Sequence, residues 1–98
     1  MLEAVKKTLR ITHTKLDDSI QDTINTARAE LIRLGILASK AEDDEDPLIR
    51  DAIKTFCQMS YTDDEKKREM FYKSWEVQAD GLRKSSGYRK EGGGEENV

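Results

Sequence analysis

The chain has 98 residues, of which 38% are charged and 36% hydrophobic, and its net charge of −3 corresponds to an isoelectric point near 5.2. A chain of this length forms one domain with a modest core, which leaves little room for a deep substrate cleft. The acidic balance argues against a stand-alone binder of duplex DNA, because such a domain needs a basic face. The single cysteine allows no internal disulfide, and neither a signal-peptide core nor a long apolar run is visible, so we expect a soluble cytosolic protein without a membrane span.

Apolar residues at helical spacing predict two helices in the N-terminal half. The first begins at Leu2 and ends near residues 10–12. The second runs from about Leu16 to Leu34, and Gly35 gives it a left-handed C-terminal end. The apolar stripes consist of Leu2, Val5 and Leu9 in the first helix, and of Leu16, Ile20, Ile24, Ala27, Leu31 and Leu34 in the second.

An uninterrupted acidic run, residues 42–46, separates the second helix from a third. Like charges in a compact segment repel each other, so this run predicts a solvated loop. Asp46 is expected to cap the third helix, with Pro47 at its first position. The apolar face of this helix is too broad for one neighbour, which predicts a central core helix. It comprises Leu48, Ile49, Ala52, Ile53, Phe56, Cys57 and Ser60.

A fourth helix is predicted to start directly after Tyr61. Met70 and Val77, seven residues apart, lie on a different face from its core-facing residues. A second apolar strip on a short helix is what a subunit contact needs, so we predict that these two residues belong to an oligomer interface. The core-facing residues are Phe71, Trp75, Gln78, Ala79 and Leu82, with Tyr72 alongside.

Two Thr-x-x-acid patterns resemble capping boxes. Thr14 is followed by Asp17 before the second helix, and Thr62 is followed by Glu65 before the fourth. In a capping box the threonine hydroxyl and the acidic side chain satisfy backbone N–H groups of the first turn. We therefore expect these pairs to start the two helices.

The composition changes from Ser85 onward to Ser, Gly and charged residues, which predicts a flexible C-terminal tail. The expected class is all-α, a small bundle of about four helices, with a helical domain at residues 1–86 and a tail at residues 87–98. Basic residues flank Tyr88. They would suit a phosphate-binding patch, or they complement a helix C-terminus and aid solubility.

Chemistry-bearing clusters are absent or weak, so we predict no enzyme, no cofactor and no metal site. His13 is the only histidine and is expected on the surface or at a helix cap, and Cys57 is expected in the core. The acidic run lacks the ligand spacing of an EF-hand loop. It could hold a divalent cation loosely, form a plain solvated loop, or present a negative surface to DNA or a partner.

Three sequence segments occur in an order that is fairly specific. The first joins a Leu-Arg-Ile run to an acidic helix start, and the second continues Asp-Pro-Leu-Ile with Ala-Ile-x-Thr-aromatic-Cys. The third has Ser-aromatic-x-x-Gln and ends in Ser-Gly-Tyr. The residues concerned are Leu9, Arg10, Ile11, Asp17, Asp18 and Ile20, then Asp46, Pro47, Leu48, Ile49, Ala52, Ile53, Thr55, Phe56 and Cys57, and finally Ser74, Trp75, Gln78, Ser86, Gly87 and Tyr88.

In these segments the chain resembles the small head-tail connector (adaptor) proteins of tailed bacteriophages, which act in head completion after DNA packaging. The resemblance covers about Met1 to Tyr88. Tyrosine is commoner in the family where Trp75 stands, and threonine where Ser86 stands, and the glycine-rich end follows no family pattern.

The resemblance implies a structural protein of the virion or a prophage. Many copies would form a homo-oligomeric, dodecamer-like ring on the portal protein, at the interface between head and tail. The ring would extend the DNA channel, touch viral DNA transiently and without sequence preference, and receive the next head-completion (stopper) or tail protein. Before assembly the protein would be in the host cytoplasm.

Two further sets of residues take their expected roles from this resemblance. Gly87, Tyr88, Arg89 and Lys90 are expected to become ordered on docking to the portal. The acidic residues Asp43, Asp44 and Glu45 are expected to face the channel or a partner. Neutralising these three should then increase the retention of DNA in assembled rings.

The alternative is a small helical DNA-binding protein, either a packaging subunit or a regulator. It would need a basic recognition helix. The predicted third helix offers only Arg50 and Lys54 against Asp51 in its middle.

Overall fold

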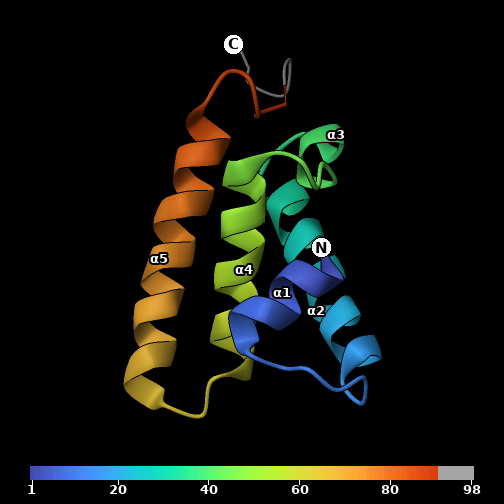
Figure 1. The fold of residues 1–98 in the computed structure, drawn as a ribbon. Helices are drawn as coiled ribbons and strands as arrows, with labels where there is room; N and C mark the ends of the chain where they lie inside the picture. The colour runs from blue at the N-terminus through green and yellow to red at the C-terminus, as the bar shows by residue number, and fades with distance from the viewer. Residues whose placement is uncertain (91–98) are drawn as a thin grey trace.

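The computed structural model describes residues 1–90, which form a helical bundle (Figure 1). The predicted all-α class, with about four helices, is confirmed, and a short α3 adds one turn. Within residues 1–90 there is no strand, only an isolated antiparallel bridge between Ile36 and Arg89. The helices are α1 (Leu2–Leu9), α2 (Asp17–Arg33), α3 (Ala38–Ala41), α4 (Pro47–Tyr61) and α5 (Glu65–Lys84).

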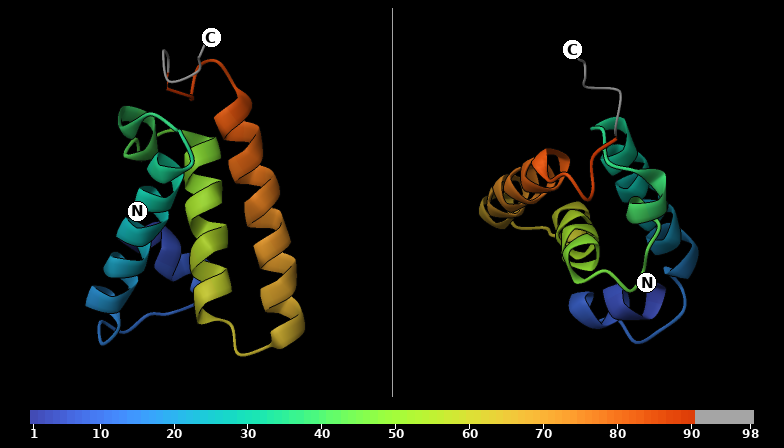
Figure 2. Two further views of the ribbon diagram at one scale, coloured as in Figure 1. Left: turned by 180° about the vertical axis from the view of Figure 1, so that it is seen from behind. Right: turned by 90° about the horizontal axis from the view of Figure 1, so that it is seen from above.

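Helix α4 lies at the centre of the bundle. Helices α2 and α5 flank it on opposite sides and run in the direction opposite to it, and α1 crosses a third side (Figures 1 and 2). The predicted central position is confirmed, because α4 buries Ile49, Ala52, Ile53 and Cys57 completely. The prediction was wrong for two members of its apolar face, Leu48 and Ser60, which are exposed at the two ends of the helix.

Helix α2 ends as the sequence predicts. Gly35 has a φ of +103°, the left-handed region that favours glycine. The N–H of Ile36 donates to the carbonyl of Leu31 at 3.0 Å, and that of Gly35 donates to Ile32 at 3.0 Å. These are the two hydrogen bonds of a Schellman end. They turn the chain sharply and bring Ile36 into the core, where it is fully buried.

The predicted capping box at Thr14 and Asp17 was wrong. The carbonyl of Thr14, not its side chain, accepts from the N–H of Asp17 at 3.2 Å, and α2 has no side-chain cap. The Asp17 carboxylate instead pairs with Lys6 of α1, with 2.7 Å between Oδ1 and Nζ. Only 6% of the Lys6 side chain is exposed, so its charged amine needs a partner of opposite charge. Asp17 therefore pairs with Lys6 instead of capping α2. The pair ties α1 to the start of α2.

The predicted capping box at Thr62 and Glu65 was also wrong. Helix α4 continues to Tyr61, and Thr62 is the residue that ends it. The cap of α5 is Asp64, whose Oδ1 accepts from the N–H groups of Lys66 at 2.9 Å and Lys67 at 3.2 Å. A carboxylate at this position also complements the positive helix N-terminus. Helix α5 therefore begins at Glu65, a few residues after the predicted start.

One core connects all five helices. Its buried hydrophobic residues are Val5, Ile20, Ile24, Ala27, Leu31, Ile36, Ala41, Ile49, Ala52, Ile53, Cys57, Trp75, Ala79 and Leu82. The predicted apolar stripes supply most of them. Ile36 and Ala41 are not among the predicted core residues, because no helix was expected between Gly35 and the acidic run.

Candidate assembly surfaces

Helix α5 is the most exposed long element of the bundle. It packs mainly on α4, and of its 20 residues only Trp75, Ala79 and Leu82 are buried. Met70 is 65% exposed and Val77 is 73% exposed. Both lie on the side of the helix opposite Trp75, as their spacing predicts. Their role in subunit contact stays a prediction.

Trp75 is the anchor that holds α5 against α4. Its ring lies edge-on to that of Phe56, with centroids 4.9 Å apart and planes 65° apart. This edge-to-face arrangement is favourable for aromatic pairs because the positive ring edge meets the negative face. Ala79 and Leu82 continue the same buried line by one and two turns. The opposite face of α5 is therefore exposed to solvent.

Open grooves run along both sides of α5 and meet at Val77. One, of about 520 Å³, lies between α5 and α2, with Tyr72 and Arg33 among its lining residues. The other, of about 300 Å³, lies between α5 and α4 and is lined by Leu48 and Gly81 as well. Leu48, which was predicted to face the core, and Tyr72, predicted beside the core-facing line of α5, are each about half exposed. Apolar surface therefore borders α5 on both sides.

The residues after α5 form a strap across the end of the bundle, defined here as residues 85–90. The Leu37 N–H donates to the Tyr88 carbonyl at 2.7 Å, and the Lys90 N–H donates to the Gly35 carbonyl at 2.8 Å. The Tyr88 ring packs against the core, with Lys40 Nζ 5.2 Å from its centroid. In the tail predicted to begin at residue 87, Tyr88, Arg89 and Lys90 thus contact the bundle. Residues 91–98 of the tail lie outside the described part of the chain.

Asp46 joins this strap to α4. Its Oδ2 accepts from the Tyr88 hydroxyl at 2.8 Å, while its Oδ1 accepts from the N–H of Leu48 at 2.9 Å, which confirms the predicted cap. Burial raises the pKa of Asp46, but hydrogen bonds from Tyr88 and from the Ile49 and Leu48 N–H groups, with the charge of Lys40, outweigh it. The pKa of Asp46 therefore lies below its ordinary value. The bond to Asp46, followed by burial, raises the pKa of Tyr88.

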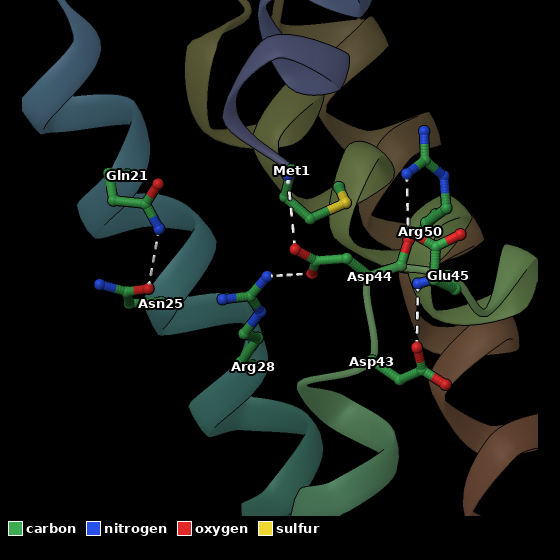
Figure 3. A network of polar contacts seen from close by, with 8 residues as sticks. All are labelled: Met1, Gln21, Asn25, Arg28, Asp43, Asp44, Glu45 and Arg50. Atoms are coloured by element: carbon green, nitrogen blue, oxygen red, sulfur yellow. Dashed lines mark hydrogen bonds and ion pairs between the residues drawn. The ribbon is translucent and has the colours of Figure 1, made fainter.

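The acidic segment is a junction of several contacts (Figure 3). The Asp44 carboxylate pairs with Arg28 of α2 and lies 3.5 Å from the Met1 nitrogen, and its carbonyl accepts from Arg50 Nη1 at 3.0 Å. Asp43 Oδ1 accepts from the Glu45 N–H at 2.9 Å. Basic groups of α2 and α4, together with the amine of Met1, thus offset the repulsion that the sequence suggested. The predicted role of Asp43, Asp44 and Glu45 toward DNA or a partner stays a prediction.

His13 and Cys57, the two residues considered for catalysis or metal binding, occupy structural positions. His13 is exposed, and its Nδ1 accepts from the Lys15 N–H at 3.2 Å in the turn before α2. Cys57 is buried in α4, and desolvation raises its pKa to about 11, so the thiol stays protonated at neutral pH. Among residues 1–90, no three His, Cys, Asp or Glu side chains are grouped to hold a metal ion. No described helix has the length and apolar character needed to cross a membrane.

The position of α4 bears on the DNA-binding alternative. A recognition helix must present one face to the major groove. Helix α4 is enclosed by α1, α2 and α5, and the guanidinium of Arg50 already contacts the Asp44 carbonyl. The helix that the alternative would use is therefore the one least able to enter a groove.

Comparison with known proteins places this helical bundle in a family. A family model described as phage connector protein matches residues 1–81. No curated protein and no solved structure gives a significant match. The family match begins at Met1 and extends into the last turn of α5, so it includes every buried core residue except Leu82, together with the exposed Met70 and Val77. The chain belongs to the phage connector protein family.

Proposed function

We propose that this protein is a head-tail connector whose copies assemble as a ring on the portal protein, extend the DNA channel and present a platform for the stopper or tail protein. The proposal rests on one observation above all: in a chain of the connector family, the longest helix carries exposed Met70 and Val77 on the face turned away from the core. A ring built head to tail needs two different surfaces on each subunit. The protein would act at the head-tail interface of the virion after assembly from the host cytoplasm.

The role of this apolar face is tested by replacing Met70 and Val77 together with aspartate. Each is more than half exposed, so the folded monomer should tolerate the change, whereas buried carboxylates in a subunit contact should prevent association. Light scattering across a concentration series, with and without the portal protein, should show wild-type assemblies and a variant that stays monomeric. Circular dichroism should report equal helix content.

A matched control carries aspartate at Thr12 and Ser39, which are exposed and change the net charge equally. It should assemble like the wild type. Unchanged assembly of the Met70 and Val77 variant would remove these residues from the interface. A wild-type chain that stays monomeric even with the portal would overturn the proposed function.

The strap is proposed to supply portal contacts through Arg89 and Lys90, whose side chains are exposed. Its pairing with the α2–α3 turn uses backbone atoms, so alanine at both positions should leave the strap in place. We expect portal affinity to fall about fivefold, the effect of losing two exposed charge contacts. Alanine at Lys7 and Lys15, which are also exposed, is the control. Equal portal affinity of both variants, measured by surface binding, would exclude docking through these side chains.

In the acidic segment, only Asp43 and Glu45 are proposed to face DNA. Asp44 is engaged by Arg28 and the Met1 nitrogen. The negative charge that would face DNA in the channel, and let it pass without sticking, would therefore come from Asp43 and Glu45.

A further inference from the structure

One exposed stripe runs along α5 on the face opposite its buried line. It consists of Lys66, Met70, Lys73 and Val77, spaced by four, three and four residues, and all four are exposed. We call this stripe the α5 edge. No ion pair within residues 1–90 involves Lys66 or Lys73. The α5 edge thus combines two large apolar side chains with two uncompensated positive charges.

Helix α2 carries a stripe of the opposite character. Asp18, Asp22, Thr26 and Ala29 are spaced by four, four and three residues, and all four are exposed. We call this stripe the α2 edge. It lies opposite the residues that α2 buries, which include Ile20 and Ile24. Neither aspartate takes part in an ion pair of the described residues. Small side chains and uncompensated negative charge define this edge.

The two edges lie on opposite sides of the bundle. Helix α4 separates α2 from α5, and the view from above shows the two helices as the flanks of the molecule (Figure 2). Both run in the same direction, with their N-termini at the same end (Figure 1). The aspartates occupy the N-terminal half of α2 and the lysines the N-terminal half of α5. Two copies placed side by side in the same orientation would therefore bring the lysines level with the aspartates.

From this placement we infer that the α5 edge of one copy binds the α2 edge of the next, and that this contact repeats around the ring. The inference rests on the proposed function and names its subunit interface. With the lysines level with the aspartates, Met70 would lie between the two charge pairs. Val77 would lie beside Thr26 and Ala29, whose small side chains let the two helices approach closely. The lysine and aspartate pairs would set the register and disfavour the pairing of two α5 edges or of two α2 edges, because like charges would then meet.

The C-terminal halves of the two helices do not oppose this contact. Arg33 pairs with Glu30 at 2.8 Å, and Arg83 and Lys84 both pair with Asp80 at 2.9 Å, so these basic groups are held in ion pairs within the subunit. Two different edges also produce a heterologous contact, which closes into a ring when the rotation per subunit allows. Each subunit uses both edges and leaves neither exposed in the closed assembly.

Charge reversal tests the interface. One variant carries Lys66→Glu and Lys73→Glu, and a second carries Asp18→Lys and Asp22→Lys. Either should weaken subunit association at least about tenfold, since like charges would face each other. A third variant carries all four changes, so that every contact again joins opposite charges. It should assemble on the portal like the wild type, and light scattering measures all three.

An equimolar mixture of the first two variants should also assemble, because alternating copies restore opposite charges at every contact. The control is Lys7→Glu with Lys15→Glu, which gives the same net charge as the first variant but lies outside both edges. Circular dichroism confirms folding of each chain. Full assembly of the first two variants, or a folded four-change variant that stays dispersed, overturns this interface while the proposed function stands. A wild-type chain that ignores the portal overturns the proposed function itself.

Discussion

Replacing Trp75 with alanine should lower the free energy of unfolding by about 3 to 5 kcal/mol, the usual result of truncating a buried aromatic residue. Trp75 is 7% exposed, and its ring packs edge-on against Phe56. It is the largest of the three residues by which α5 is buried. A small domain has a free energy of unfolding of about 5 to 15 kcal/mol, so this single change removes a large part of it.

Urea unfolding followed by circular dichroism at 222 nm would measure the effect of this substitution. Val77→Ala on the same helix is the matched control, because Val77 is exposed and its truncation should change stability by no more than about 0.5 kcal/mol. If Trp75→Ala were as stable as the control, the packing of α5 on α4 would not depend on this residue. The pair of variants also separates the two faces of α5, since only the exposed face is proposed to act in assembly.

The sequence predicts the long helices well because each has an apolar stripe of helical period. The stripe of α2, from Ile20 to Leu31, is buried as expected, and so is the middle of the broad face of α4, from Ile49 to Cys57. Glycine at residue 35 and the Asp-Pro pair at residues 46–47 mark real helix ends, because their local conformations suit those positions in any context. These features depend on neighbours in sequence, and so they can be found without the fold.

The failures concern side chains with a choice of partners. Asp17 could cap its own helix or pair with a lysine of another, and the buried amine of Lys6 decides between them. Asp44 belongs to an acidic run, yet Arg28 and Arg50 approach it from other helices. Neither outcome is encoded by local spacing. Tertiary contacts that offset a charge are invisible to a reading that considers one segment at a time.

The strap is missed for a related reason. Composition after Ser85 favours disorder, but Tyr88 is an aromatic residue that can pack on the core if the chain turns back. The turn at Gly35 offers a free carbonyl, and the adjoining Leu37 offers an N–H, and the strap pairs with both. Such pairing joins residues more than 50 apart in sequence. A lone tyrosine in a polar segment was the one available signal.

The two sides of the candidate interface also differ in how readily they can be recognised from the sequence. Large exposed residues such as Met70 and Val77 stand out on a helical wheel, and the structure leaves them exposed. The α2 edge consists of small and acidic residues, which look like any solvated helix surface. Only the placement of α2 and α5 on opposite flanks, running in the same direction, suggests that the two surfaces are complementary. One side of the proposed interface can therefore be suggested by the sequence, while the other side needs the fold.

Replacing Asp46 with alanine should lower the free energy of unfolding by about 2 to 3 kcal/mol, because one carboxylate makes two kinds of contact. Loss of an aspartate cap typically costs about 1 kcal/mol, and loss of a hydrogen bond to a charged group costs about 1.5 kcal/mol or more. Asp46 caps α4 through the N–H of Leu48 and accepts from the Tyr88 hydroxyl. Urea unfolding at pH 7 measures the combined loss of stability from the two contacts. Tyr88→Phe removes the second contact alone, so it should lose only about half as much.

The pH dependence of the same variants distinguishes the charge from the shape of the side chain. The pKa of folded Asp46 lies below the ordinary value of 3.8, so its ionised form stabilises the fold above that pH, and the contribution disappears as the pH falls through the lower folded-state pKa. Asparagine at residue 46 can still cap a helix. The stability difference between wild type and Asp46→Asn should therefore be constant from pH 7 to about pH 5 and shrink below about pH 4. A difference that persists unchanged at pH 2 would show that the ionised carboxylate does not hold the strap to α4.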